Sequence, residues 1–468
     1  PELNDTADNV ANVIKSEEEA FLRTLDAGLG RIEKIFDKMT SSGSTIVDGK
    51  EAFDLYQEQG IPAELFESIA GDRGFGFDWD AYHEAKEKHA FDSGKGMGGV
   101  MGDFGPLDEI KRDLKSTEFV GYACTKDYGK VCGLIENGQL VDSLDSDGKD
   151  QLLVLDRTPF YAESGGQVGD HGLIVGPQGK FQVTDVQKSG DIIVHHGSMV
   201  EGKITREDLV TGEVEDPRRD GIPRAHSATH IFHFALQKFL GEHAQQRGSR
   251  VEDDHLRFDF ANNEAVSSED LQKIEKESMQ RVREAADIKA EILPMEDARQ
   301  QGALMLFGEK YPDPVRMVSI GDYSKELCGG THVANTSEIE SFELFGEEAV
   351  STGIRRIVAL TGEKAKQNAA ETLAILKESG ALLEVNAVQA VDAVGKLLKH
   401  TRALKKQLGG GKPADFVPLT AGESSKMDYA QSRQTLKQLA LALNVPTTGV
   451  VDRIKALQQE IASLKQQV

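Results

Sequence analysis

Apolar residues recur every three or four positions through the first part of the chain. The spacing is regular from Leu22 to Met39. Ser16 and Glu19 stand before it in the arrangement of a capping box, the side-chain pair that starts many helices. This pattern predicts a helix over residues 1–40, which ends at the serine and glycine residues that follow.

The patterning then changes from helical to strand-like. Helical patterns at 49–70 and 80–91 lead to a glycine-dense stretch at 94–99, which we interpret as a linker. From about residue 113, short runs rich in β-branched and aromatic residues lie between turn residues, at 118–124, 151–156, 172–175 and 192–194. These runs predict a small, mostly antiparallel sheet or barrel.

Residues 158–170 interrupt the strand pattern with three glycines. Glycine lets the backbone approach another backbone or a ligand closely. The stretch fits a hairpin connection and a ligand-binding loop equally well.

The part of the chain after residue 220 mixes both patterns. Pro223 precedes a predicted helix that runs to Leu240, and residues 246–249 are predicted to form a turn. An amphipathic helix is expected at 267–286, and strands are expected at 256–260, 288–292, 316–320 and 353–359. Beyond residue 362 the helical period returns. Its last apolar stripe, over 451–468, fits either a coiled-coil seam or packing against a neighbouring helix.

These patterns predict an α+β multidomain fold with four parts. They are a helical N-terminal region (1–112), a small β-barrel-like subdomain (113–220), a zinc-binding α+β core (221–362) and a helical C-terminal stalk (363–468).

Composition limits the kinds of protein that this chain can be. It has 468 residues, of which 39% are hydrophobic, and it contains no apolar run of about 18 residues, so no membrane span is predicted. Three cysteines in this length indicate a reducing compartment, hence a cytoplasmic protein without disulfides. We expect Cys124 and Cys132 to be buried structural thiols. The chain begins with Pro1 rather than Met, which suggests a segment of a longer protein.

The net charge of −24 is unevenly distributed. Residues 364–468 carry 15 Lys and Arg against 9 Asp and Glu, a balance of +6, so the rest carries −30. A mildly basic tail on an acidic body is compatible with local contact to a polyanion. On charge alone, a solvated helical face is the simpler interpretation.

Two short motifs offer metal ligands at helical spacing. His226 and His230 are four positions apart and would share one face of a helix, and Cys328 and His332 repeat this spacing on a glycine-rich turn. Three imidazoles and a thiolate suit Zn²⁺. The separation of 98 residues between the pairs is too long for a zinc finger. It is ordinary for a site that a folded domain assembles.

Other interpretations of the histidine pair remain open. A histidine pair at this spacing is often only the polar face of a helix. His233 follows as a rival ligand or, more simply, as a packed or supporting histidine. Ser227 stands where a zinc peptidase would carry its glutamate, which argues against that class of enzyme.

Several longer motifs, in this order and spacing, resemble the editing domain of the alanyl-tRNA synthetase family. They are DRTPFYAESGGQ at 156–167, HSATH at 226–230, LRFDF at 256–260, LFGEKY at 306–311, ELCGGTH at 326–332, RRI at 355–357 and TG at 361–362. The resemblance is strong over 113–362. Residues 1–110 are similar to the end of the family's helical tRNA-recognition region, and 363–468 resemble an unusually long entry to its C-terminal stalk. The resemblance places the ATP-binding aminoacylation domain and the globular C-terminal domain outside these residues.

The resemblance implies an activity and partners. The parent enzyme of this family attaches alanine to tRNA(Ala) using ATP, and this segment is expected to hydrolyse mischarged Ser-tRNA(Ala) and Gly-tRNA(Ala). The resemblance implies one Zn²⁺ per chain, bound by His226, His230, Cys328 and His332, which would position the amino acid or activate a water. Cys328 is also expected to be a catalytic residue. Thr229 and Gln246 are candidates to contact the substrate or, alternatively, to support the helix.

Four further points stay open at this level. Arg355 and Arg356 either contact tRNA phosphates or pair with acidic neighbours. The last helix offers a surface for self-association. Rival functions are a free-standing trans-editing deacylase and a non-catalytic tRNA-binding module with a structural zinc. The editing domain of threonyl-tRNA synthetase shares the two ligand motifs but resembles the rest of the chain much less.

Overall fold

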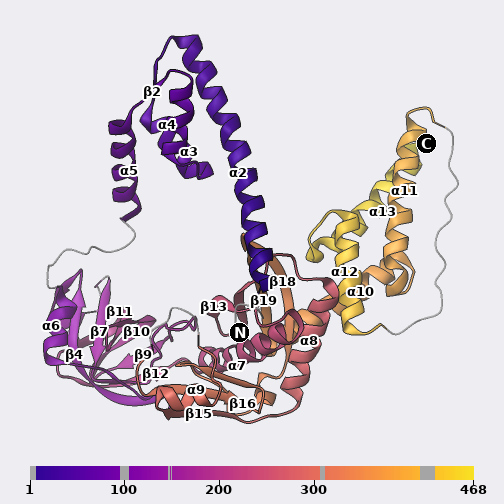
Figure 1. Ribbon diagram of the computed structural model, residues 1–468. Coiled ribbons are helices and arrows are strands. Elements are labelled where there is room, and N and C mark those ends of the chain that lie inside the picture. The colour runs from indigo at the N-terminus through magenta and orange to yellow at the C-terminus, as the bar shows by residue number, and fades with distance from the viewer. Residues whose placement is uncertain are drawn as a thin grey trace.

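The structure is a computed structural model that describes residues 7–94, 105–145, 148, 150–305, 311–411 and 427–467. Helices and strands follow one another in mixed order along several separate cores, as predicted for an α+β multidomain chain (Figure 1). The domain boundaries at 112, 220 and 362 remain a prediction. The expected linker at 94–99 lies outside the described residues from position 95 onward.

The N-terminal region is helical, as its apolar period predicts. It contains α2 (Ala7–Ser42), α3 (Gly49–Gln59), α4 (Ala63–Asp72) and α5 (Trp79–Gly94), with a two-stranded pairing of β1 (Ile46–Val47) and β2 (Gly76–Phe77). Asp48 caps α3 by accepting a hydrogen bond from the backbone of Lys50, and Gly60 ends it in the left-handed conformation. Phe36 and Phe66 are buried at the centre of this helical core.

The next region is a closed barrel, which confirms the barrel form of the prediction. Helix α6 (Pro106–Asp113) precedes it. The strands of the barrel sheet are β4 (Lys126–Glu136), β5 (Gln139–Leu140), β6 (Ser143–Asp145), β7 (Gln151–Leu155), β9 (Gly172–Val175), β10 (Gln178–Ser189), β11 (Ile192–Thr205) and β12 (Leu209–Val214). The order β10-β9-β12-β4-β7-β11 closes on itself because β10 also pairs with β11. Closure removes the open sheet edges, and alternate strand residues fill the interior.

The predicted strand at 118–124 is wrong beyond its first two residues. Only β3 (Glu118–Phe119) pairs, in parallel with β8 (Arg157–Thr158). The chain then turns, with the backbone N–H of Ala123 donating to Val120. A tertiary contact explains the turn, because the carbonyl of Gly121 accepts a hydrogen bond from the buried Arg219 instead of a neighbouring strand.

The expectation that Cys124 and Cys132 are buried is also wrong. Both thiols are half-buried. Among the described residues, neither belongs to the ligand cluster that contains the third cysteine, Cys328.

The following region carries the two ligand motifs. The long helix α7 (Asp216–Leu240) and helix α8 (Ser268–Arg283) pack on a four-stranded sheet, β13 (Gln246–Val251), β14 (His255–Ala261), β19 (Ile354–Thr361) and β18 (Phe342–Ser351), in that order. A three-stranded sheet of β15 (Ile288–Leu293), β16 (Val315–Ile320) and β17 (Ser324–Leu327) lies beside it with α9 (Met295–Gln300). The short turn η1 (Thr336–Ile339) closes this core.

Helix α7 begins earlier than its proline suggested. It starts at Asp216 and contains Pro223, rather than starting after that residue. An interior proline costs a helix about 3 kcal/mol. Arg219 offsets that cost in the first turns, because its guanidinium makes a buried ion pair with Asp170 and donates 2.8 Å hydrogen bonds to the carbonyls of Gly121 and Pro159.

The predicted turn at 246–249 is instead the start of strand β13. The strand pairs with β14 through a bulge between Gln246 and Gly248. A glycine in a strand pattern is consistent with a bulge as well as a turn, and only the partner strand decides between them.

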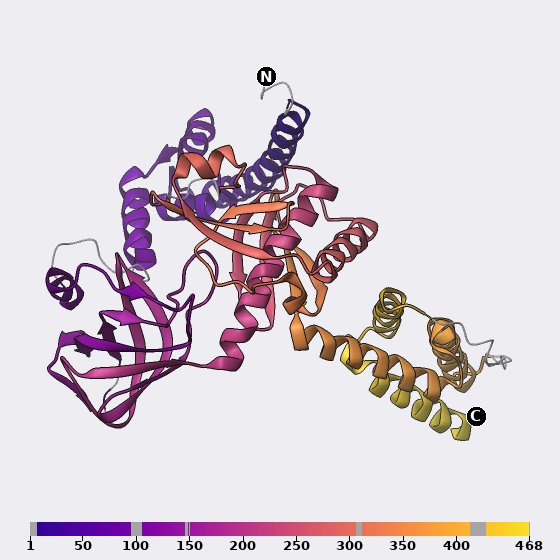
Figure 2. The ribbon, with the colours of Figure 1, turned by 90° about the horizontal axis from the view of Figure 1, so that it is seen from below.

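The chain ends in helices α10 (Gly362–Leu383), α11 (Ala390–Leu408), α12 (Tyr429–Leu443) and α13 (Val450–Gln467). Figures 1 and 2 both place these four helices together, to one side of the ligand-bearing core. Ile454 and Leu457 of the last stripe are buried in a core shared with the other helices of the same chain, so packing rather than a coiled-coil seam explains their spacing. Among the residues that the structure describes, none of the helices has both the length and the apolar character to cross a bilayer.

Candidate metal centre

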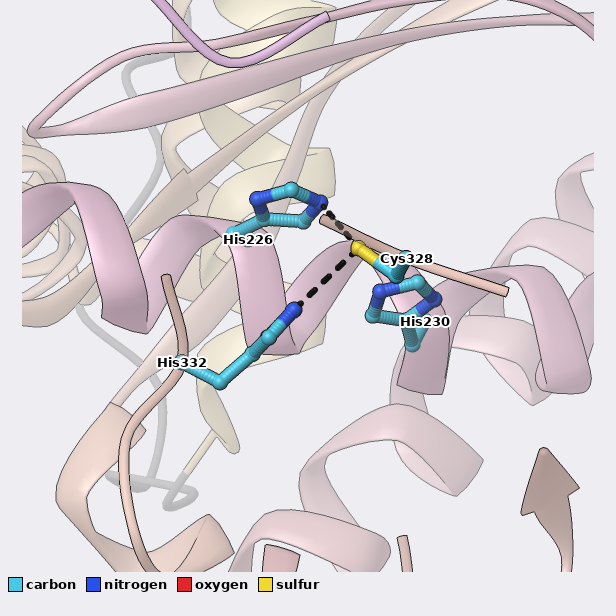
Figure 3. Close-up of side chains that lie close together, drawn as sticks. All are labelled: His226, His230, Cys328 and His332. Carbon is cyan, nitrogen blue, oxygen red and sulfur yellow. Dashed lines mark hydrogen bonds between the residues drawn. The ribbon is translucent and has the colours of Figure 1, made fainter. Parts of the chain in front are cut away.

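Two elements far apart in sequence bring the four predicted ligands together. His226 and His230 lie one turn apart on α7, while Cys328 follows β17 directly and His332 lies four residues further along that loop. Their ligand atoms all lie within 4.8 Å of one another. The Cys328 Sγ is 3.4 Å from Nε2 of His226 and 3.3 Å from Nε2 of His332, and the rings converge on it (Figure 3). The predicted ligand cluster is therefore assembled by the fold.

The outward nitrogen of each imidazole has a protein partner. Nδ1 of His226 lies 2.8 Å from Oε1 of Gln167, and Nδ1 of His332 lies 3.1 Å from Oγ of Ser227. Such partners fix which ring nitrogen carries the proton and leave the other free for a metal.

His230 shows the same arrangement most clearly. Its Nδ1 lies 2.9 Å from Oε2 of Glu326. Its Nε2 is buried and has no hydrogen-bond partner among the described residues. An orphaned buried nitrogen is costly unless something binds it. A cation held by three imidazole nitrogens and one thiolate would satisfy it, and this donor set fits Zn²⁺.

The charges around the cluster favour the ligand forms that a cation needs. Burial raises the pKa of the Cys328 thiol, but His226, His332 and His230 together outweigh burial and hold that pKa well below its usual value. Burial lowers the pKa of His332 to about 3, so its ring is neutral. For His230, burial is outweighed by Glu326 and Cys328, which raise its pKa to about 10. A metal bound here would displace the proton of His230.

Glu326 is the buried carboxylate that orients two histidines at once. Its second oxygen lies 3.2 Å from Nδ1 of His233, which is therefore a supporting residue and not a member of the ligand cluster. Burial raises the pKa of the Glu326 carboxyl, but His230 and His233 hold it below its usual range.

The loop that carries Cys328 is held by its carbonyl groups. Arg316 donates to the carbonyls of Cys328 and Gly330 at 2.8 and 3.0 Å. The hydroxyl of Tyr122 donates to the carbonyl of Gly329 at 2.6 Å. The guanidinium also lies 4.2 Å from the ring centroid of Tyr122. Gly330 is required here, because a Cβ at this position would come within 2.0 Å of the His226 ring.

The cluster lies at the wall of a cavity of 460 Å³. The segment between β8 and β9 contributes Tyr161, Ser164 and Gly165, and strand β10 contributes Lys188. Helix α7 contributes Thr229, His233 and Gln237, and β13 contributes Gln246 and Ser249. Among the described residues that line it, Lys188 is the one lysine or arginine. The lining is mixed, because Leu304, Met305 and Leu327 lie beside the polar groups, as in most small-molecule sites.

Both predicted substrate-contacting residues line this cavity. The Thr229 hydroxyl donates to the carbonyl of Ala225 at 2.9 Å, which leaves its oxygen able to accept. The amide of Gln246 donates to Ser249 at 3.1 Å. Their contact with a substrate remains a prediction. Of the motif at 306–311, only Tyr311 is described, and it also lines the cavity.

The two arginines at 355 and 356 pair with acidic neighbours, one of the two alternatives predicted for them. Arg355 lies 2.6 Å from Glu347, and Arg356 makes a bidentate contact of 2.7 and 2.8 Å with Asp259. These contacts occupy the guanidinium groups within the β18–β19–β14 sheet.

Sequence reasoning did not single out Gln167 or Glu326 as supports of the ligands. Both stand inside quoted motifs, Gln167 at the end of the glycine-rich stretch and Glu326 two positions before Cys328. That position was the available signal, because carboxylates and amides commonly hold the outer nitrogen of a metal-binding histidine.

Comparison with known proteins first identifies a class. The family model described as "tRNA synthetases class II (A)" matches residues 1–218. The one described as "Threonyl and Alanyl tRNA synthetase second additional domain" matches residues 315–358, which include Cys328 and His332. The barrel, the ligand cluster and these matches together define part of a class II aminoacyl-tRNA synthetase.

Individual relatives narrow the class to one family. An alanine–tRNA ligase of Rhodopirellula baltica is 44% identical over 485 aligned residues, which cover 100% of this chain and 51% of the ligase. Those of Halorhodospira halophila and Bacillus subtilis are both 37% identical, over 99% and 87% of this chain and 52% and 46% of the ligases. The chain belongs to the alanyl-tRNA synthetase family. It spans about half the length of the curated relatives that it matches.

Proposed function

We propose that this chain is the editing part of an alanine–tRNA ligase and that it hydrolyses Ser-tRNA(Ala) and Gly-tRNA(Ala). The observation that carries the proposal is the cluster of His226, His230, Cys328 and His332 at the wall of a cavity that also contains hydrogen-bonding side chains. Attachment of alanine to tRNA(Ala) with ATP is proposed for the whole protein. Zn²⁺ is the ion proposed for the cluster, one per chain, because the donor set is three nitrogens and one sulfur.

Hydrolysis breaks the ester between the amino acid and the terminal ribose of the tRNA. The oxygen of a water forms a bond to the carbonyl carbon, the bond from that carbon to the ribose oxygen breaks, and a proton passes to the ribose oxygen. Bound Zn²⁺ would supply a fixed positive charge and Lewis acidity beside the carbonyl group. The protein residues hold the ester in place and supply the hydrogen bonds.

Hydrogen-bonding groups in the cavity wall support the proposed choice of substrate. An apolar pocket rejects an added hydroxyl only weakly, so a synthetase site for alanine discriminates poorly against serine. A second site with hydrogen-bonding groups favours the hydroxyl instead. Thr229 and Gln246 are the groups on α7 and β13 that we assign to this contact.

A deacylation assay with zinc-loaded protein tests the proposal. We expect chain 1–468 to hydrolyse Ser-tRNA(Ala) and to leave Ala-tRNA(Ala) largely intact. Cys328→Ala should lose the metal, measured by elemental analysis, together with the activity. Cys124→Ala, which removes a half-buried thiol outside the cluster, should keep both.

One structural observation favours a second function. The cluster already offers four protein ligands, as closed structural zinc sites do, whereas catalytic sites usually keep one position open. A tRNA-binding module with a structural zinc would bind Ser-tRNA(Ala) without hydrolysing it. Stable Ser-tRNA(Ala) in the presence of metal-loaded protein would replace the editing proposal with this one.

A further inference from the structure

The helical region after residue 361 contains an internal repeat. When residues 369–407 are placed on 429–467, a shift of 60 positions, 11 of the 39 pairs are identical. They include Leu376 and Lys377 with Leu436 and Lys437. They also include the dipeptide Val-Asp at 391–392 and at 451–452. We call these two segments the first and the second hairpin.

The backbone repeats at the same interval. Helix α10 ends at Leu383 and α12 ends at Leu443, and the next residue in each case is left-handed, Glu384 with φ 54° and Asn444 with φ 53°. A glutamate rarely adopts this conformation. Its occurrence at the equivalent position of the first hairpin shows that the two helix ends share one geometry.

The connections that follow also correspond in their hydrogen bonds. The N–H of Val385 donates to Gly380 at 3.0 Å, and that of Val445 donates to Ala440 at 3.1 Å. Each connection then forms a single 3₁₀ turn, η2 (Ala387–Gln389) or η3 (Thr447–Gly449), before α11 and α13 begin at positions 390 and 450.

Equivalent apolar positions face one another across the two hairpins. Leu376 and Leu436 are buried in one common core, as are Val394 and Ile454. Each hairpin therefore covers the apolar face of the other. Figures 1 and 2 show the four helices as one group.

Polar contacts also cross between the hairpins. Nζ of Lys455 on α13 lies 2.8 Å from Glu378 on α10, and the amide of Gln458 donates to the carbonyl of Leu382 at 2.6 Å. These contacts fix the position of α13 along the axis of α10.

The second hairpin has one feature that the first lacks. Arg433 on α12 contacts two carboxylates of the ligand-bearing core, lying 2.9 Å from Glu275 on α8 and 3.1 Å from Glu343 on β18, and it donates to the carbonyl of Leu344 at 2.9 Å. Leu373 stands at the equivalent position of the first hairpin and is 49% exposed. The second hairpin alone has acquired this anchor.

We propose that residues 429–467 are a duplicate of residues 369–407 and that the duplicate binds the original within the same chain. The partner that this apolar surface fits is thus a copy of the hairpin itself, and Arg433 fastens the pair to the core. The apolar stripe of α13 is then covered within the same chain at Val450, Ile454 and Leu457. The inference is independent of the proposed editing activity.

Chemical cross-linking in the full chain tests the intrachain arrangement. Glu378→Cys and Lys455→Cys place thiols at the ends of an exposed ion pair, in a background with Cys124 and Cys132 changed to Ser. A short bismaleimide should join them within one chain, seen as a cross-linked tryptic peptide pair from protein of monomer size. An equimolar mixture of the two single variants should give no covalent dimer.

Two outcomes would overturn the proposal. Covalent dimers in the mixture would mean that α13 packs on the α10 of another chain. Absence of the cross-link in both samples would mean that the hairpins do not pack together as described.

Hydrogen exchange tests the anchor separately. Arg433→Met should make the amides of α12 exchange about tenfold faster or more, because it leaves the buried Glu343 and the half-buried Glu275 without their cation. Arg453→Met, which removes a half-buried arginine from the same hairpin, is the matched control. Equal protection of α12 in the two variants would exclude Arg433 as the anchor.

Discussion

Gln167 joins the barrel to both halves of the ligand cluster. Its Oε1 lies 2.8 Å from Nδ1 of His226 on α7 and 2.9 Å from the backbone nitrogen of Thr331, and its Nε2 donates to the Thr331 hydroxyl at 3.0 Å. One fully buried amide thus orients a ligand on the helix and the loop between Cys328 and His332. The ligand cluster depends on the barrel region although none of its four residues comes from there.

This relationship predicts a weaker metal site in Gln167→Ala. Removal of the amide frees the His226 ring and the loop, so metal affinity should fall by about 10- to 100-fold. Competition with a chelator measures the affinity directly. Gln178→Ala, at an exposed barrel position, is the control. Unchanged affinity in Gln167→Ala would show that the amide does not hold the ligand.

Gln246→Ala is predicted to separate specificity from metal binding. The side chain lines the cavity but belongs to no ligand set, so zinc content should stay the same. Loss of its hydrogen bond should reduce the preference for Ser-tRNA(Ala) over Ala-tRNA(Ala) by about 1–3 kcal/mol. The ratio of the two kcat/KM values gives this number. An unaltered ratio would remove Gln246 from the substrate site.

Lys188 is predicted to contact a phosphate of the tRNA acceptor end. Binding should weaken steeply with salt, because each phosphate contact releases counterions. Lys188→Ala should reduce the slope of log affinity against log salt concentration by about 0.7–0.9. Lys203→Ala makes the same change of charge on the neighbouring strand β11, outside the cavity lining, and it should keep the parent slope. Identical slopes for both variants would contradict the assignment.

The barrel is predicted to lose stability in weak acid because of His195. Burial lowers the pKa of this ring to about 4, although its bond to the carbonyl of Leu153 acts in the opposite direction. The ring donates from Nδ1 to that carbonyl at 2.9 Å and lies 2.8 Å from the Thr158 hydroxyl, so the folded protein holds it neutral.

The sign of the effect follows from proton uptake. Below about pH 6.5 His195 of the unfolded chain binds a proton, whereas His195 of the folded chain stays neutral down to about pH 4. The stabilisation from neutral His195 is therefore complete above pH 6.5 and falls by up to about 1.4 kcal/mol per pH unit below it. Urea unfolding of the parent and of His195→Gln between pH 7 and 4 checks this, with His196→Gln as control. Parallel curves for the parent and His195→Gln would disprove it.

Local patterns in the sequence determined helix α2 and the four residues of the ligand cluster. The apolar period of the first 40 residues predicts α2, and the spacing of four places His226 and His230 on one face of α7, because both properties depend only on helical geometry. The motif at Cys328 and His332 supplies the other two donors, because a thiolate and an imidazole are side chains that bind Zn²⁺.

Only the tertiary structure decided what depends on distant partners. Pro223 lies inside α7 because Arg219 is anchored in the barrel, and residues 246–249 form a strand because β14 pairs with them. The supports Gln167 and Glu326 act on histidines 59 and 96 residues away, across contacts that no local pattern encodes. A buried polar group needs a hydrogen-bond partner, and the fold of the whole chain decides which residue lies close enough to be that partner.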